Sequence, residues 1–164
     1  MLLSSKRFSY EDASTNLLAI YNQMTEAIGI AGRDNHLSEE VLREILKHLD
    51  SVVQRSGNLL ALAGLPMTEA TVTIDDPRRP NMATVRVLLD ELNEYSNAAS
   101  SEAAYHEEAI QITQTGTETI VGSLNNFFFK ARILRLWLLR ELNDYHPKRR
   151  LPRRLRLARS QRRN

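Results

Sequence analysis

Apolar residues recur every three or four positions along much of the chain, which is the spacing of an amphipathic helix. One such stripe lies between residues 10 and 31 and follows Ser9, and a second lies between residues 39 and 63 and follows Ser38. Serine is a favoured helix N-cap, because its hydroxyl accepts a hydrogen bond from a backbone N–H of the first turn. The pattern therefore predicts two helices that begin next to Ser9 and Ser38.

The middle of the chain interrupts this spacing. Residues 67–81 contain the alternating stretch Thr71-Val72-Thr73-Ile74 and two prolines, which predicts a long loop with a short extended piece. A third stripe predicts a helix at about 81–97, followed by a turn at 97–101.

The last third of the chain predicts one long helix from about 101 to 145, which we expect Pro147 to end. A hairpin over the Thr-rich residues 106–122 is the alternative, although helical spacing fits them better. Together the elements predict an all-α fold: an antiparallel bundle of about four helices with a long last helix and a basic C-terminal arm. We expect a helical bundle domain at 1–146 and an Arg-rich arm at 147–164.

Candidate catalytic and metal-binding motifs are few. The chain has no cysteine, which excludes disulfides, thiolate catalysis, zinc fingers and iron–sulfur clusters. Glu44–His48 and Glu102–His106 have i, i+4 spacing, which favours a surface ion pair over a metal site. Gly-rich phosphate loops, G-x-S-x-G and H-E-x-x-H do not occur. We therefore expect no enzyme, and no catalytic residue, metal, cofactor or small-molecule substrate.

The most apolar stretch, residues 127–142, holds five charged residues in 16 positions. It is too short and too charged to cross a bilayer, and the N-terminus lacks the apolar core of a signal peptide. These features predict no membrane partner and an intracellular protein, cytoplasmic or nuclear, or a component of a virion.

The same stretch is apolar around most of the helix circumference, which is a larger apolar surface than a single bundle needs to bury. This excess predicts a homo-oligomer whose subunit interface contains Phe127, Phe128, Phe129, Trp137, Leu138 and Leu139. The alternative is that the first nine residues or the 67–81 loop cover this surface.

Charge is distributed unevenly along the chain. The net charge is +2, but residues 1–129 carry 9 basic and 18 acidic residues, whereas residues 130–164 carry 13 basic and 2 acidic ones. The arm at 147–164 contains no acid. Its basic residues are Lys148, Arg149, Arg150, Arg153, Arg154, Arg156, Arg159, Arg162 and Arg163.

Eight of these nine cations are arginine, whose planar donor fork matches phosphate oxygens. The arm therefore predicts binding to RNA or DNA. Because it has no aromatic residue for base stacking, we expect no dependence on base sequence. Arg78, Arg79, Arg132 and Arg135 could add phosphate contacts, although ion pairs with helix acids are an equal alternative for Arg132 and Arg135.

Other interpretations of the arm are a nuclear-localisation signal, docking on an acidic protein surface such as a neighbouring subunit, and contact with anionic lipid. The sequence thus predicts a non-enzymatic, self-associating coat, nucleocapsid or packaging subunit. The alternative is an adaptor in a larger complex, whose basic tail docks on an acidic partner or directs nuclear import.

Overall fold

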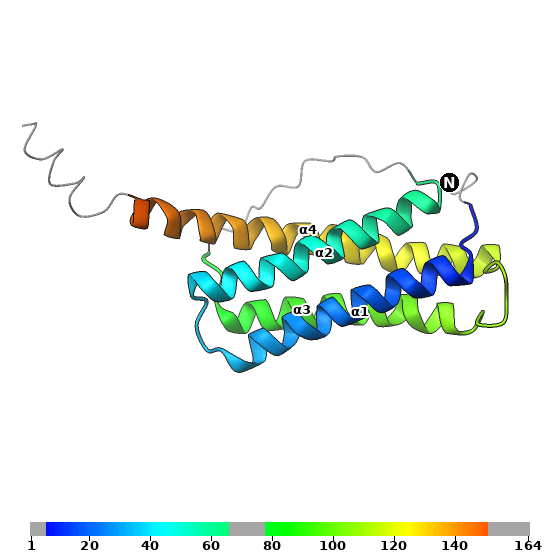
Figure 1. Ribbon diagram of the computed structural model, residues 1–164, viewed down its shortest axis with the longest axis horizontal. Helices are drawn as coiled ribbons and strands as arrows, with labels where there is room; N and C mark the ends of the chain where they lie inside the picture. Colours follow the sequence, from blue (N-terminus) through cyan, green and yellow to red (C-terminus); the bar gives the residue numbers. More distant parts are fainter. Residues whose placement is uncertain (1–5, 66–77, 151–164) are drawn as a thin grey trace, which may run out of the picture.

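The computed structural model describes the backbone of residues 6–65 and 78–150, and the side chains as far as Tyr145. Within these ranges the chain forms helices and no strand, so the predicted all-α fold is confirmed. The helices are α1 (Tyr10–Arg33), α2 (Glu39–Leu62), α3 (Met82–Ala104) and α4 (Gln114–Arg150) (Figure 1). The predicted extended piece at Thr71–Ile74 lies outside the described residues.

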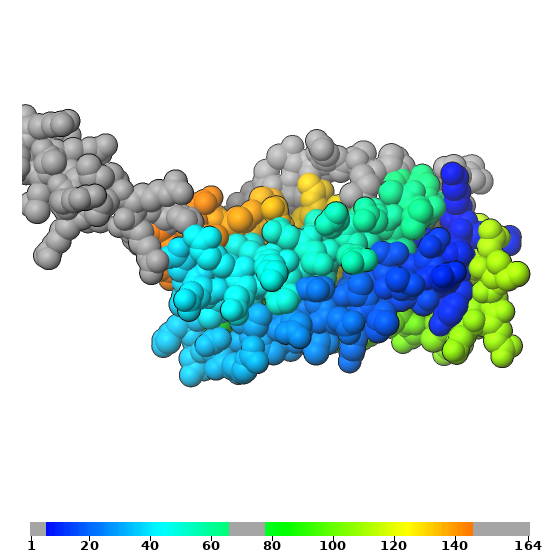
Figure 2. All heavy atoms as spheres, viewed as in Figure 1, coloured from blue at the N-terminus to red at the C-terminus, as the bar shows by residue number. Residues whose placement is uncertain are grey.

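Each helix packs against two others. Helix α1 contacts α2 and α3, and α4 contacts the same two helices, so α1 and α4 lie on one diagonal of the bundle and α2 and α3 on the other. The colours in Figure 1 show that helices in contact run in opposite directions, whereas α2 and α3 run the same way. On the face in Figure 2, side chains of α1 and α2 lie side by side along the bundle.

The helix starts follow from capping side chains. Ser9 and Ser38 each accept a hydrogen bond from the backbone N–H three residues later, at 3.0 and 3.2 Å, which confirms both predicted starts. Asn81 does the same for α3 at 2.9 Å. The Thr113 hydroxyl accepts a bond from the Gly116 N–H at 3.1 Å and caps α4. Each cap supplies an acceptor for a backbone donor that has no partner within its helix.

Two predicted boundaries in the second half of the chain are wrong. The turn expected at 97–101 is helical, because Ala99 and Ala103 are buried and continue the core-facing stripe of α3. The single helix expected over 101–145 is instead divided by residues 105–113, which connect α3 to α4.

The expected end of the last helix at Pro147 is also wrong, since α4 continues to Arg150. Proline removes one backbone donor and crowds the preceding turn. Here this loss falls in the final turn of a 37-residue helix, where few further hydrogen bonds depend on it.

One end of the bundle is closed by the residues that precede α1. The backbone of Phe8 accepts a hydrogen bond from Ile112 N–H at 2.8 Å, and the Phe8 N–H donates to the Thr117 hydroxyl at 3.4 Å. Phe8 and Ile112 are both buried in the core. The segment also reaches α2, because Lys6 N–H donates to the carbonyl of Ala63 at 2.8 Å. Three distant parts of the chain therefore meet at this end.

Candidate nucleic-acid-binding end of the bundle

The predicted phosphate-binding arm begins at the other end of the bundle, far from the start of α1 (Figure 1). Lys148, Arg149 and Arg150 form the last three backbone positions of α4, and their side chains are not described. The six remaining cations lie outside the described residues, namely Arg153, Arg154, Arg156, Arg159, Arg162 and Arg163. The structure therefore locates the base of the arm.

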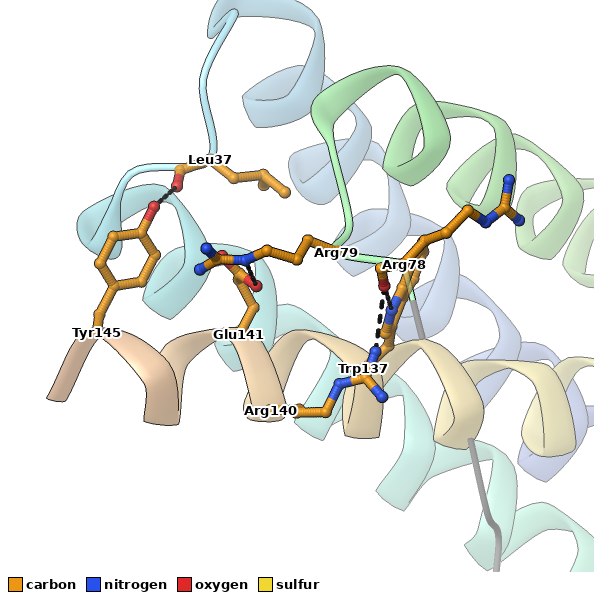
Figure 3. A network of polar contacts seen from close by, with 7 residues as sticks. All are labelled: Leu37, Arg78, Arg79, Trp137, Arg140, Glu141 and Tyr145. Carbon is orange, nitrogen blue, oxygen red and sulfur yellow. Dashed lines mark hydrogen bonds and ion pairs between the residues drawn. The ribbon is translucent and has the colours of Figure 1, made fainter. Parts of the chain in front are cut away.

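The C-terminal half of α4 is attached to the bundle by a bidentate ion pair (Figure 3). The Arg79 guanidinium donates to both carboxylate oxygens of Glu141, at 2.7 and 3.1 Å. Glu141 is only 6% exposed, so it depends on this partner for the stability of its charge. The hydrogen bond to Glu141 and the charge of that carboxylate raise the pKa of Arg79 above its ordinary value. Glu141 is one of only two acids after residue 129, and this pair compensates its charge.

Three further hydrogen bonds reinforce this attachment. The indole N–H of Trp137 and the guanidinium of Arg140 both donate to the carbonyl of Arg78, at 3.1 and 3.2 Å. One turn further on, the Tyr145 hydroxyl donates to the carbonyl of Leu37, in the α1–α2 connection, at 3.0 Å. Figure 3 shows both groups of contacts along the same side of α4. The arm therefore starts from a helix end that is held at several points.

The predicted subunit interface requires a correction. Phe127 and Leu138 are fully buried and Trp137 is 6% exposed, so these three side chains belong to the core of a single chain. They are buried because α4 packs against two helices and because Arg78–Pro80 adjoins Trp137, as the loop alternative anticipated in part. Phe128 and Leu139 are partly buried against the core, and Phe129 is half-exposed. Of the six, only these three remain accessible to a second subunit.

The middle of α4 carries basic side chains that already contact carboxylates or an aromatic ring of the bundle. Lys130 forms an ion pair with Glu91 of α3, and the hydrogen bond to that carboxylate raises the pKa of Lys130. Arg135 forms an ion pair with Asp50 of α2, in agreement with the ion-pair alternative for this residue. The Arg132 guanidinium lies over the Phe128 ring, 5.4 Å from its centre. These contacts leave the arm as the stronger candidate for binding phosphate.

The described histidines lie outside any cluster of three possible metal ligands. His106 lies 3.3 Å from Glu102, as the spacing predicted, while His48 contacts Gln23 of α1 across the helix interface. Among the described residues, no three His, Cys, Asp or Glu side chains are placed to hold a metal ion. No described helix combines the length and the apolar character needed to cross a membrane.

Sequence reasoning missed the attachment of α4 and a groove between α1 and α3. Nothing in the spacing of Arg79 and Glu141, 62 positions apart, indicates that they pair. The groove lies between α1 and α3, has a volume of about 430 Å³, and is lined mainly by apolar and small side chains. Compared with known proteins, the chain matches no family model, no curated protein and no solved structure.

Proposed function

We propose that this protein is a non-enzymatic, self-associating helical subunit that binds RNA or DNA through its C-terminal arm. It would serve as a coat, nucleocapsid or packaging-type structural protein. In this proposal the antiparallel bundle provides the assembly surface and the arm neutralises phosphate. The observation that carries the proposal is the composition of residues 147–164, with nine Lys or Arg residues and no acid. A segment of this kind releases condensed counterions when it binds phosphate, which favours binding without sequence preference.

The attachment of α4 supports this proposal. The base of the arm is held by the Arg79–Glu141 pair and by the Trp137 and Tyr145 hydrogen bonds. The arm therefore starts from a fixed position at one end of the bundle. Because Arg79 compensates Glu141, one of the two acids after residue 129 no longer opposes phosphate close to the arm, and Asp144 is the other.

The test replaces the six arginines after Arg150 by glutamine and keeps the chain length unchanged. The matched control replaces the same six by lysine, which preserves charge and removes the donor fork. Binding to a labelled single-stranded RNA, a DNA of the same sequence and an unrelated sequence is measured by fluorescence anisotropy over a salt series. If all nine cations engage phosphate, the slope of log affinity against log salt is about −6 for a single strand, since each contributes about −0.7.

The glutamine variant is expected to retain a slope of about −2, because three cations remain. The lysine control should keep a steep slope. All three nucleic acids should bind alike, because they share the phosphate backbone. Retention of wild-type affinity and slope by the glutamine variant would show that the arm is not the binding element. Failure of the wild-type chain to bind at about 50 mM salt would reject the proposed function itself.

A further inference from the structure

The proposed function assigns no ligand to the groove between α1 and α3, which is an apolar surface. Its floor and walls come from the first half of α1 and the last turns of α3. The lining residues are Tyr10, Ser14, Leu17, Leu18, Tyr21, Asn97, Ser100, Ser101, Ala103 and Ala104. Leu18 and Tyr21 are 61% and 47% exposed, so large apolar side chains stand at the surface here. The volume of about 430 Å³ lies in the range of sites that hold a few side chains of a ligand.

The two chain segments that line this groove carry acidic side chains and no Lys or Arg, and Lys6 and Arg7 lie just before the first segment. Residues 8–32 hold three Asp or Glu and no Lys or Arg, and residues 87–113 hold six Asp or Glu and no Lys or Arg. These two segments contain every lining residue of the groove. Two of these acids already have partners, because Glu91 is paired with Lys130 and Glu102 lies beside His106. Glu94 has the helical spacing that places it on the same face of α3 as Asn97 and Ser101, which line the groove. An apolar groove in an acidic surrounding favours a ligand that is both basic and partly apolar.

The C-terminal arm has this chemistry. Nine basic residues are interspersed there with Leu151, Leu155, Leu157 and Ala158, and no acid is present. We propose that the arm of a second copy of this chain docks in the α1/α3 groove. Its leucines would contact the Leu18 and Tyr21 surface, and its arginines would pair with the surrounding carboxylates.

The dimensions of the bundle indicate that the docked arm belongs to another molecule. The groove lies beside the start of α1 and the end of α3, at the end of the bundle opposite to Arg150 (Figure 1). Helix α4 has 37 residues and is therefore about 55 Å long. The 14 residues after Arg150 span at most about 50 Å when fully extended. Only the last few residues of a taut arm could reach the groove of its own chain.

Docking of this kind joins two different surfaces, the arm of one copy and the groove of the next. Such a head-to-tail contact propagates, and it forms a ring when the rotation closes and an open chain when it does not. The inference does not require nucleic-acid binding, although the two would compete for the same arm. Phosphate would then release the arm from its neighbour, so added nucleic acid would dissociate this head-to-tail assembly.

Because the natural chain has no cysteine, introduced cysteines can test the contact directly. The double variant Leu18→Cys/Leu155→Cys is oxidised after nuclease treatment and examined on a non-reducing gel. A disulfide between copies gives a ladder of dimer, trimer and higher species. The control Val87→Cys/Leu155→Cys uses a residue of α3 that is 65% exposed and does not line the groove, and it should give no ladder.

Light scattering of nuclease-treated protein supplies an independent measurement. Wild-type chain is expected to form multiples of the monomer mass at about 50 mM salt and to dissociate at about 1 M, where the Debye length is about 3 Å. Leu18→Arg/Tyr21→Arg should remain monomeric at both salt concentrations, and the control Val87→Arg should behave as wild type. The groove variant should keep its affinity for nucleic acid, since its arm is intact.

An equal ladder in the Val87 control, a disulfide within one chain in place of a ladder, or association that survives Leu18→Arg/Tyr21→Arg would each overturn the inference. These results are separable from the proposed function. If the wild-type chain fails to bind RNA or DNA but gives the Leu18–Leu155 ladder, docking stands and nucleic-acid binding fails. If it binds nucleic acid and remains monomeric after nuclease treatment, docking fails and nucleic-acid binding by the arm stands.

Discussion

Gly116 gives a sharp test of the packing between α4 and the α3–α4 connection. This residue lies in the first turn of α4 and is buried. A Cβ added there would lie 2.4 Å from Nε2 of His106 and 2.9 Å from Cγ2 of Ile112. The variant Gly116→Ala should therefore unfold more easily than the wild type, although alanine is ordinarily the better helix former.

The two opposing terms can be compared. Replacing glycine by alanine within a helix stabilises a protein by about 0.5–1 kcal/mol. Overpacking a filled core costs about 1–3 kcal/mol, and displacement of His106 would also weaken its contact with Glu102, a pair of the type worth about 0.3–0.5 kcal/mol. Ile112 is fully buried, so the core around it must adjust if its side chain moves. The net result should be a destabilisation of about 0.3–3 kcal/mol.

Gly122 provides a matched control in the same helix. It is exposed, and an added Cβ would meet no atom within 4 Å. Gly122→Ala should therefore stabilise the protein by about 0.5–1 kcal/mol. Urea unfolding followed by circular dichroism at a helical wavelength measures both variants. The midpoint should fall for Gly116→Ala and rise for Gly122→Ala, with an unchanged dependence on denaturant.

A third variant identifies the source of the effect. Two of the three closest atoms belong to His106, so His106→Ala in the Gly116→Ala background should recover part of the lost stability. If Gly116→Ala is as stable as the wild type or more so, the connection does not pack against α4 as described. The argument from close contacts would then be refuted.

Two further predictions compare similar residues in different environments. Ser96 is fully buried and its hydroxyl has no hydrogen-bond partner, so Ser96→Ala should raise the free energy of unfolding by about 1 kcal/mol. Ser56→Ala removes a 2.7 Å hydrogen bond to a backbone carbonyl and should lower the free energy of unfolding by about 0.5–1.5 kcal/mol. Equal effects in urea unfolding would contradict this distinction. Phe127→Ala should cost about 3–5 kcal/mol because the ring is fully buried, and Phe129→Ala should cost less than about 1 kcal/mol. A large loss of monomer stability in Phe129→Ala would mean that this ring is not at the surface.

The sequence predicted the parts of the fold that depend on local signals. Ser9 and Ser38 precede regular apolar stripes, and both proved to be N-caps at the expected places. Gly64, just after α2, adopts a φ of 81°, which glycine tolerates and which suits the expected stop.

The boundary between α3 and α4 could not be predicted in this way. Residues 105–113 contain neither glycine nor proline, and their apolar residues fit helical spacing. The break arises from a distant contact, because Ile112 pairs with Phe8 and is fully buried while Ile110 is 91% exposed. This alternation belongs to extended chain and not to a helix. Residues far apart in the sequence decided the local structure.

The sequence predicted the amino-acid composition of the candidate site but not its geometry. The charge of the arm could be counted from the sequence, but the attachment at its base depends on Arg79 and Glu141, which only the folded chain brings together. The interface prediction failed at Phe127, Trp137 and Leu138 for a related reason. A helix in contact with two others and with the 78–80 segment buries more of its circumference than a helix with one buried face.

The contacts of Phe8 also constrain the order in which the protein can form during its synthesis. Helices α1 and α2 pack directly on each other and leave the ribosome before α3 and α4, so this hairpin can assemble early. Phe8, however, has its backbone partners at Ile112 and Thr117, more than 100 positions later. Its ring therefore stays exposed until most of the chain has been translated. Closure of that end is a late event, and the Phe8 ring stays accessible to chaperones throughout the interval.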